Sequence, residues 1–305
     1  MISPQHKKEH NFAALLFTAL VLVAALVGGA KGHTQREATL LTVKPTASAT
    51  ADKPVPAGQA AAPAIMKSAA FLLNTTQAPT LLPSISAAAA LVEDIDSGKI
   101  LYDLHSDKQW SAASLTKLVT AVSAIESFGD DPNIKVSASA IATESAAGYL
   151  VAGRSYELAE LLRAMLVFSS NDAAAAISEY FGKGAFVEML NKKASEIGMA
   201  NSRFFDPHGL TPLNLTTARD LKSLVHYIYD AHRDIFDITR EKIEGATHPF
   251  AGQEDFLGGK TGFIDESAGN LISLFRYQGR PVVIIVLGSK QRAEDTQILK
   301  DWFLN

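Results

Sequence analysis

Ser114 and Lys117 place a hydroxyl and an amine three residues apart. In a helix this spacing puts both side chains on one face, so both can reach the same cavity. A serine beside a base is the arrangement of a nucleophile that attacks a carbonyl carbon. Lysine has an ordinary pKa of about 10.4, so Lys117 can act as a base near neutral pH only if burial or a neighbouring cation lowers that value. The pair alone also fits an ordinary helix start with a solvated lysine.

Two further motifs favour the chemical interpretation. Ser169-Ser170-Asn171 lies in a predicted loop between two helices, where it can present a hydroxyl and an amide or simply cap the second helix. Lys260-Thr261-Gly262 follows two glycines and precedes an apolar pair, which predicts a strand that a ligand can approach closely, or a surface turn. The three motifs in this order are the known signature of penicillin-binding proteins and class A β-lactamases.

The elements that position these motifs follow from hydrophobic spacing. Two β-rich runs at 88–95 and 100–104 flank a turn, which predicts an opening hairpin. Apolar residues spaced by three and four predict helices over 115–125, 158–168, 186–197 and 218–228, the last opened by a capping box at Thr217 and Asp220. Apolar runs at 271–276 and 282–287 and a helix ending near Trp302 close the chain. Strands at both ends and helices between them predict an α+β fold with a central antiparallel sheet.

The N-terminal part has a different composition. Residues 12–30 carry no charged side chain and span about 28 Å as a helix, enough to cross a bilayer. Lysines and arginines on both sides leave the orientation undecided, and the small residues at 28–30 also permit signal cleavage. We predict a cytoplasmic tail at 1–11, a transmembrane anchor or signal segment at 12–30, a Pro/Ala/Thr-rich linker at 31–85 and a globular domain at 86–305.

Composition excludes some classes of function. A formal net charge of -4 provides no basic surface for nucleic acid. The absence of cysteine excludes disulfides and thiolate chemistry. The eight histidines show no close ligand spacing, so we predict neither a metal site nor a cofactor.

Residues 86–305 resemble the low-molecular-mass penicillin-binding proteins of the serine D-Ala-D-Ala carboxypeptidase family. The segments that carry the resemblance are 94–101, 114–121, 170–174, 186–210 and 217–221. The resemblance implies a transpeptidase/β-lactamase-like fold with a sheet of about five strands, flanking helices, an all-helical lobe and an active site in the groove between sheet and lobe. It also implies that peptidoglycan stem peptides and β-lactam antibiotics are the partners.

The resemblance also implies a role for each matched residue. Ser114 would be acylated, Lys117 would take its proton, and Ser169 would relay a proton to the departing D-alanine. Asn171 would hold the substrate's amide, and Lys260 and Thr261 would bind its carboxylate, with Lys260 also lowering the pKa of Lys117. The backbone N–H groups of Ser114 and Phe263 would form the oxyanion hole. For Arg219 we expect an ordinary ion pair, for His208 a structural role, and for Tyr149 a place in the core or at the groove.

Several alternatives remain open at this stage. The scissile bond is either the terminal D-Ala-D-Ala bond or a cross-link between two stem peptides. The chain departs from the family pattern at Ala112, Ser170 and Phe263, and its segment between 237 and 260 is short, which leaves leaving-group specificity open. A β-lactamase is less favoured, because Glu188 and Asn191 are one residue too close for the Glu-x-x-Leu-Asn pattern. A wall-binding module without turnover is a third hypothesis. The expected location is the outer face of the cytoplasmic membrane, or secretion if residues 12–30 are cleaved.

Overall fold

The computed structural model describes residues 82–128, 131–144 and 149–304. The predicted tail, the predicted anchor and most of the linker lie outside these residues. Among the helices that the structure describes, none combines the length and apolar character needed to cross a bilayer.

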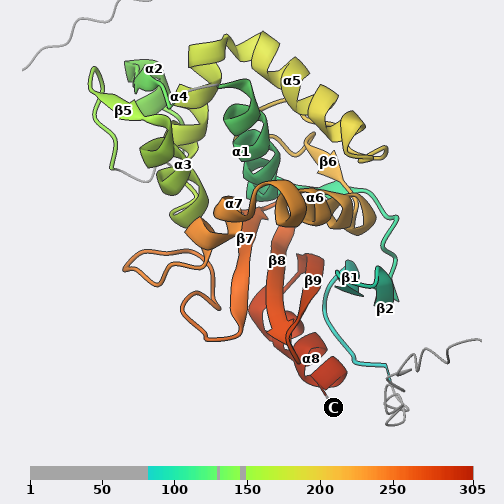
Figure 1. The fold of residues 1–305 in the computed structure, drawn as a ribbon. Helices are drawn as coiled ribbons and strands as arrows, with labels where there is room; N and C mark the ends of the chain where they lie inside the picture. The colour runs from blue at the N-terminus through green and yellow to red at the C-terminus, as the bar shows by residue number, and fades with distance from the viewer. Residues whose placement is uncertain (1–81, 129–130, 145–148, 305) are drawn as a thin grey trace, which may run out of the picture. The chain divides into compact units, whose positions relative to one another are not determined.

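A five-stranded antiparallel sheet forms the centre of the fold, as predicted (Figure 1). Its spatial order is β2-β1-β9-β8-β7, so β7, which carries the Lys260 motif, lies at one edge. The strands are β1 Ala89–Asp94, β2 Lys99–Leu104, β7 Phe256–Ile264, β8 Ala268–Tyr277 and β9 Arg280–Ser289. The predicted opening hairpin is confirmed, since β1 pairs with β2 through Val92 and Tyr102. Two short two-stranded sheets accompany it: β3 Trp110–Ser111 with β6 Leu215–Thr216, and β4 Asn133–Lys135 with β5 Ser155–Glu157.

The helices fall into those that cover the sheet and those that form a lobe above it (Figure 1). They are η1 Ala113–Leu115, α1 Thr116–Ser127, α2 Ala138–Ile141, α3 Leu158–Val167, α4 Asn171–Phe181, α5 Lys183–Glu196, α6 Ala218–Ala231, α7 Arg233–Thr239 and α8 Arg292–Leu304. All the predicted helices are present; the short helices α2 and α7 were not predicted. In the lobe, α4 contacts α2, α3 and α5, and α1 packs against α5.

Alternating side chains on the strands give the sheet two buried faces. Leu91 and Ile285 pack with α1 and α6 on one face. Val92 and Ile284 point to the other face, where they meet Leu299 of α8. Both faces are therefore covered, and the groove can open only where the edge strand β7 meets the lobe.

The capping box predicted at Thr217 and Asp220 is only half formed. The Thr217 hydroxyl accepts a bond from the Asp220 N–H at 3.0 Å and so caps α6. The Asp220 carboxylate does not return the bond; it accepts from the Asn201 N–H at 2.8 Å and the Ser202 hydroxyl at 2.7 Å. Asp220 thus ties the loop after α5 to the start of α6.

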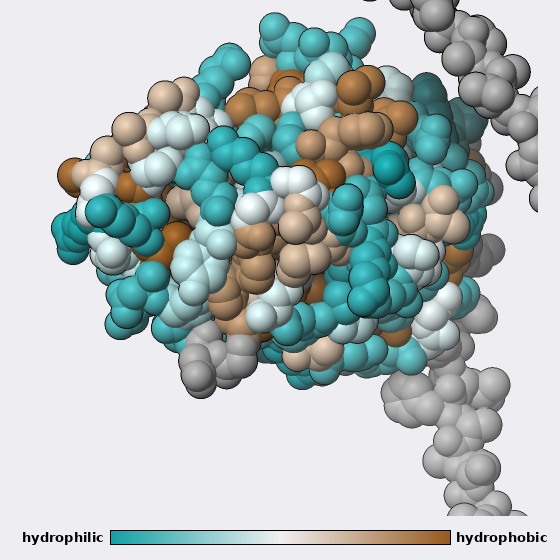
Figure 2. Space-filling model, turned by 90° about the horizontal axis from the view of Figure 1, so that it is seen from above, coloured by the Kyte–Doolittle hydropathy of each residue, from teal (hydrophilic) through white to brown (hydrophobic). Residues whose placement is uncertain are grey.

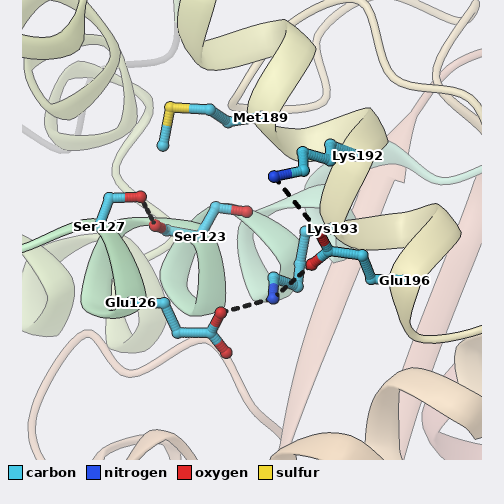
Figure 3. A pocket seen from close by; sticks show the side chains of 7 residues that line it. All are labelled: Ser123, Glu126, Ser127, Met189, Lys192, Lys193 and Glu196. Carbon is cyan, nitrogen blue, oxygen red and sulfur yellow. Dashed lines mark hydrogen bonds and ion pairs between the residues drawn. The ribbon is translucent and has the colours of Figure 1, made fainter.

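A charged cluster joins α1 to α5 (Figure 3). Lys193 Nζ lies 2.5 Å from a Glu126 carboxylate oxygen and 2.8 Å from one of Glu196. Tyr227 and His232 also hydrogen bond to Glu126. Seen from above, hydrophobic and hydrophilic residues are interspersed over this face of the molecule (Figure 2). The bonds of Glu126 thus link α1 to Lys193 on α5.

Candidate active site

Ser114 and Lys117 meet where η1 passes into α1. Lys117 Nζ lies 2.9 Å from Ser114 Oγ. The turn before them is tight: Ala113 has φ of 47°, and Gly209 packs directly against its carbonyl. A Cβ on Gly209 would lie 1.9 Å from the Ala113 oxygen, so only glycine permits this approach. The loop after α5 therefore supports the backbone that presents Ser114.

Lys117 is completely buried, as the predicted chemistry requires. Its Nζ also donates to Asn171 Oδ1 at 2.6 Å and to the carbonyl oxygen of His208 at 2.7 Å. Burial lowers the pKa of Lys117 to about 7, against the charges of Asp206 and Asp172, which raise it. A large fraction of Lys117 is thus uncharged at neutral pH and able to accept a proton from Ser114.

Ser169 and Lys260 form a second hydroxyl–amine pair. Lys260 Nζ donates to Ser169 Oγ at 3.0 Å and to the Thr261 carbonyl at 2.9 Å. Burial lowers the pKa of Lys260 well below its usual value, and the charges of Lys117 and Arg292 lower it further. Of the two causes expected for a low pKa of Lys117, burial and a neighbouring cation, burial is the main one in the structure.

A groove with a volume of about 630 Å³ opens above these pairs. Its lining includes five of the seven predicted site residues: Ser114, Ser169, Asn171, Thr261 and Phe263. The other two, Lys117 and Lys260, lie buried and reach the groove through their bonds to the two serines. The structure therefore brings all seven together.

Asn171 is engaged on both sides of its amide. Its Oδ1 accepts from Lys117, and its Nδ2 donates to the Glu144 carbonyl at 2.8 Å. It begins α4, while Ser170 is the N-cap and accepts from the Ala173 N–H at 3.0 Å. The capping alternative thus applies to Ser170, which leaves Ser169 and Asn171 directed at the lysines.

The outer edge of β7 can supply an oxyanion donor. The Gly259 N–H points away from β8, because it donates to Thr239 Oγ1 at 2.9 Å. N–H groups of alternate residues in a strand point to the same side, so the Phe263 N–H points outward as well. Ser114 lies in the first turn of η1, where N–H groups have no partner inside the helix. These two donors are compatible with the predicted oxyanion hole.

Thr247 and Arg292 line the groove although sequence analysis did not single them out. Thr247 donates to the Val167 carbonyl at 3.1 Å and accepts from the Thr261 hydroxyl at 3.1 Å. Arg292 donates to the Gly262 carbonyl at 2.6 Å. The only sequence signal for Thr247 was its place in the short segment before the third motif.

The remaining expectations have mixed outcomes. Arg219 forms ion pairs with Asp103 and Asp107, as expected. Tyr149 is 54% exposed, and its ring centroid lies 4.6 Å from that of Phe168, a groove residue, so it is not a core tyrosine. Glu188 lines a separate cavity and not the groove.

The His208 ring contacts Asp206, but its main-chain carbonyl reaches Lys117, which the sequence did not indicate. Among the described residues, no three potential metal ligands gather.

Comparison with known proteins agrees with this geometry. The family model for D-alanyl-D-alanine carboxypeptidase matches residues 74–291. A D-alanyl-D-alanine endopeptidase of Pseudomonas aeruginosa is 30% identical over 73% of the chain and 78% of its own length. The D-alanyl-D-alanine carboxypeptidase DacC of Escherichia coli is 27% identical over 72% of the chain and 62% of its own length. The structure of penicillin-binding protein D2 of Listeria monocytogenes with bound ampicillin has a TM-score of 0.63 and 26% identity, covering 74% of this chain and all of that one.

Proposed function

Because the chain belongs to the D-alanyl-D-alanine carboxypeptidase family and is a homologue of low-molecular-mass penicillin-binding proteins, we propose that it is a serine D,D-carboxypeptidase. The substrate is a peptidoglycan stem peptide that ends in D-Ala-D-Ala. The observation that carries the proposal is the bond between the fully buried Lys117 amine and the Ser114 hydroxyl.

Acylation follows from that bond. Neutral Lys117 accepts the proton of Ser114 while Ser114 Oγ attacks the carbonyl carbon of the penultimate D-alanine. The N–H groups of Ser114 and Phe263 stabilise the oxyanion, and each such donor contributes roughly 3 to 4 kcal/mol in comparable enzymes. The pKa of Lys117 of about 7 suits this step, because a base is most effective when its pKa lies near the working pH.

Departure of the leaving group uses the second pair. Thr261 and Lys260 bind the terminal carboxylate, whose negative charge favours the protonated form of Lys260. As the C–N bond breaks, Ser169 gives its proton to the departing nitrogen and regains the proton that Lys117 took from Ser114, which leaves Lys117 neutral. The hydrogen bond from Lys260 to the Ser169 hydroxyl supports this role of Ser169 in proton transfer. D-Alanine leaves, and the acyl group stays on Ser114.

Hydrolysis completes the cycle. A water molecule gives a proton to Lys117 and attacks the ester carbonyl. As the ester C–O bond breaks, Lys117 returns that proton to Ser114 Oγ, and the shortened peptide leaves as a carboxylic acid. A β-lactam acylates the same serine. The ampicillin-bound relative supports this extension of the proposal.

The decisive experiment compares wild type with Ser114→Ala and with Ser127→Ala, a control at the C-terminal end of α1. Fluorescent penicillin should label wild type and the control stably, and should leave Ser114→Ala unlabelled. Equal labelling of all three proteins would show that Ser114 is not the nucleophile. Turnover of penicillin at many cycles per second would instead identify a β-lactamase. Failure of any acylation in folded protein would favour the wall-binding module.

A second candidate is a D,D-endopeptidase that cleaves cross-links between stem peptides. Its support is the 30% identity with the endopeptidase of Pseudomonas aeruginosa over most of both chains. Incubation with purified cross-linked and uncross-linked muropeptides separates the two activities. Release of free D-alanine identifies the carboxypeptidase, and release of monomeric muropeptides identifies the endopeptidase.

The proposal includes a location at the outer face of the cytoplasmic membrane, where peptidoglycan precursors lie. Its support is the uncharged run at 12–30, which lies outside the described residues. Membrane fractionation and N-terminal sequencing of the mature protein distinguish a retained anchor from a cleaved signal.

A further inference from the structure

We propose that Asp206 is a positioning residue for the catalytic amine. Its carboxylate holds the 206–211 loop against Lys117 and supplies the buried negative charge that stabilises Lys117 when it takes the proton of Ser114. The proposal rests on the proposed function of the site and adds a residue to it.

The carboxylate of Asp206 is held by main-chain donors. The N–H groups of His208, Gly209 and Thr211 donate to it at 3.0, 2.5 and 2.8 Å. The His208 ring adds Nδ1 at 3.1 Å from the same carboxylate. Burial would raise the pKa of Asp206, but the His208 ring and these N–H groups lower it overall. Asp206 is therefore ionised at neutral pH although its side chain is only 16% exposed.

The loop that Asp206 closes makes three contacts with the catalytic turn. The His208 carbonyl accepts from Lys117 at 2.7 Å, and the Pro207 carbonyl accepts from the Thr120 hydroxyl at 2.6 Å. Gly209 packs on the Ala113 carbonyl, next to Ser114. A shift of this loop would therefore move a partner of the base and the backbone of the nucleophile together.

The charges around Lys117 come from three sides. Asp206 in the loop and Asp172 on α4 both raise the pKa of Lys117, and Asp206 has the larger effect. Lys260 on β7 repels it, since the two amines lower each other's tendency to protonate. The other partners of its Nζ, at Ser114, Asn171 and His208, are uncharged oxygens.

This balance has a consequence for catalysis. Without the charge of Asp206, burial would lower the pKa of Lys117 further, so the amine would be neutral over more of the working pH range but would be a weaker base. A base of lower pKa accepts the serine proton less readily, so acylation slows even though more of the amine is neutral. Asp206 thus keeps the pKa of Lys117 high enough for the neutral amine to be an effective base.

Asp206→Asn removes the charge and keeps Oδ1 as acceptor for the N–H groups of His208 and Gly209, although the Thr211 N–H loses its acceptor Oδ2. The acylation rate with a fluorescent penicillin is measured from pH 5 to 9. In Asp206→Asn, the pH at which the acylation rate reaches half its plateau should move down by about one unit from about 7. The plateau rate itself should fall about ten-fold. Asp237→Asn, the same change at an exposed carboxylate on α7, should leave both unchanged.

A titration of Lys117 by NMR in protein with labelled lysine side chains gives a readout that does not depend on acylation. The Lys117 resonance should titrate about one unit lower in Asp206→Asn than in wild type. An unchanged midpoint would overturn the proposal even in an active enzyme. If wild type were never acylated, the proposed function would fail while this titration would still test Asp206.

Asp206→Glu keeps the charge but changes the length of the side chain, and it covers the case in which the asparagine variant does not fold. The acid limb should stay within about 0.3 units of wild type, and the plateau rate should fall several-fold because the loop is displaced. A wild-type rate in this variant would overturn the positioning role.

Discussion

The hydroxyl of Thr247 lies 3.1 Å from the hydroxyl of Thr261, and the same Thr247 oxygen lies 3.1 Å from the carbonyl of Val167. Thr247 therefore connects the end of α3, just before Ser169, to the strand that carries Lys260. It joins the second and third motifs across the groove.

Thr247→Val keeps the shape of this side chain and removes both hydrogen bonds. We expect kcat/KM for a D-Ala-D-Ala peptide to fall by about 2- to 10-fold, because Thr261 loses the partner that orients its hydroxyl. Steady-state kinetics measure the change. Thr247→Ser, which keeps the hydroxyl, is the matched control, and equal losses in both variants would contradict the role.

The acylation rate should rise with pH on the acid side of neutrality. The neutral form of Lys117 is the base, and its pKa is about 7, so the rate should reach half its plateau near that pH. Stopped-flow measurements with a chromogenic β-lactam from pH 5 to 9 give the profile. A rate independent of pH over this range would show that Lys117 is not the base.

Gly209→Ala should impair both stability and acylation. The new Cβ would meet the Ala113 carbonyl, and alanine would also have to adopt φ of 83°. Gly153→Ala is the matched control, since Gly153 has φ of 84° with no atom within 4 Å. The backbone cost of about 1–2 kcal/mol applies to both variants. Thermal melting should show a larger loss of stability for Gly209→Ala than for Gly153→Ala, and only Gly209→Ala should acylate more slowly. Equal losses of stability and equal acylation rates in the two variants would show that the contact of Gly209 with Ala113 has no special role.

The link between α1 and α5 should weaken in acid. Burial raises the pKa of Glu126, but bonds from Lys193, Tyr227 and His232 lower it overall to about 2. The folded state therefore binds the proton less readily than the unfolded chain, so this stabilisation is present above about pH 4.5 and is lost as pH falls towards 2.

Glu126→Gln tests that link. At pH 7 the variant should lose about 1 kcal/mol of unfolding free energy, and the difference from wild type should shrink as pH falls below 4. Urea denaturation at a series of pH values measures it. A difference that stays constant from pH 7 to pH 3 would contradict the assignment. Glu188→Gln, on α5 outside the cluster, serves as the control.

Local patterns predicted the elements well where the signal lies within a few residues. The apolar spacing at 158–168 became α3, and the β-rich runs at both ends became the central sheet. The half-formed box at Thr217 shows the limit of such patterns. A serine or threonine with an acid three residues later has the right local chemistry, but Asp220 found better partners in Asn201 and Ser202, which only the folded chain brings near.

The site shows the same division between local and distant contacts. The sequence alone predicted the set of Ser114, Lys117, Ser169, Asn171, Lys260, Thr261 and Phe263, because their types and order match a family pattern, and the structure brings these seven residues together. It could not identify Thr247, since a threonine in an irregular segment has no pattern of its own. It also could not identify the His208 carbonyl, because every residue has one.

The sequence by itself determined that a hydroxyl and an amine share one helical turn, because that relationship depends only on a spacing of three residues. Only the tertiary structure decided that the amine is reactive. The pKa of Lys117 is lowered by its removal from water, and it stays at about 7 because the charges of Asp206 and Asp172, which lie far along the chain, raise it again. Burial and long-range charge are properties of the folded molecule, and no local pattern contains them.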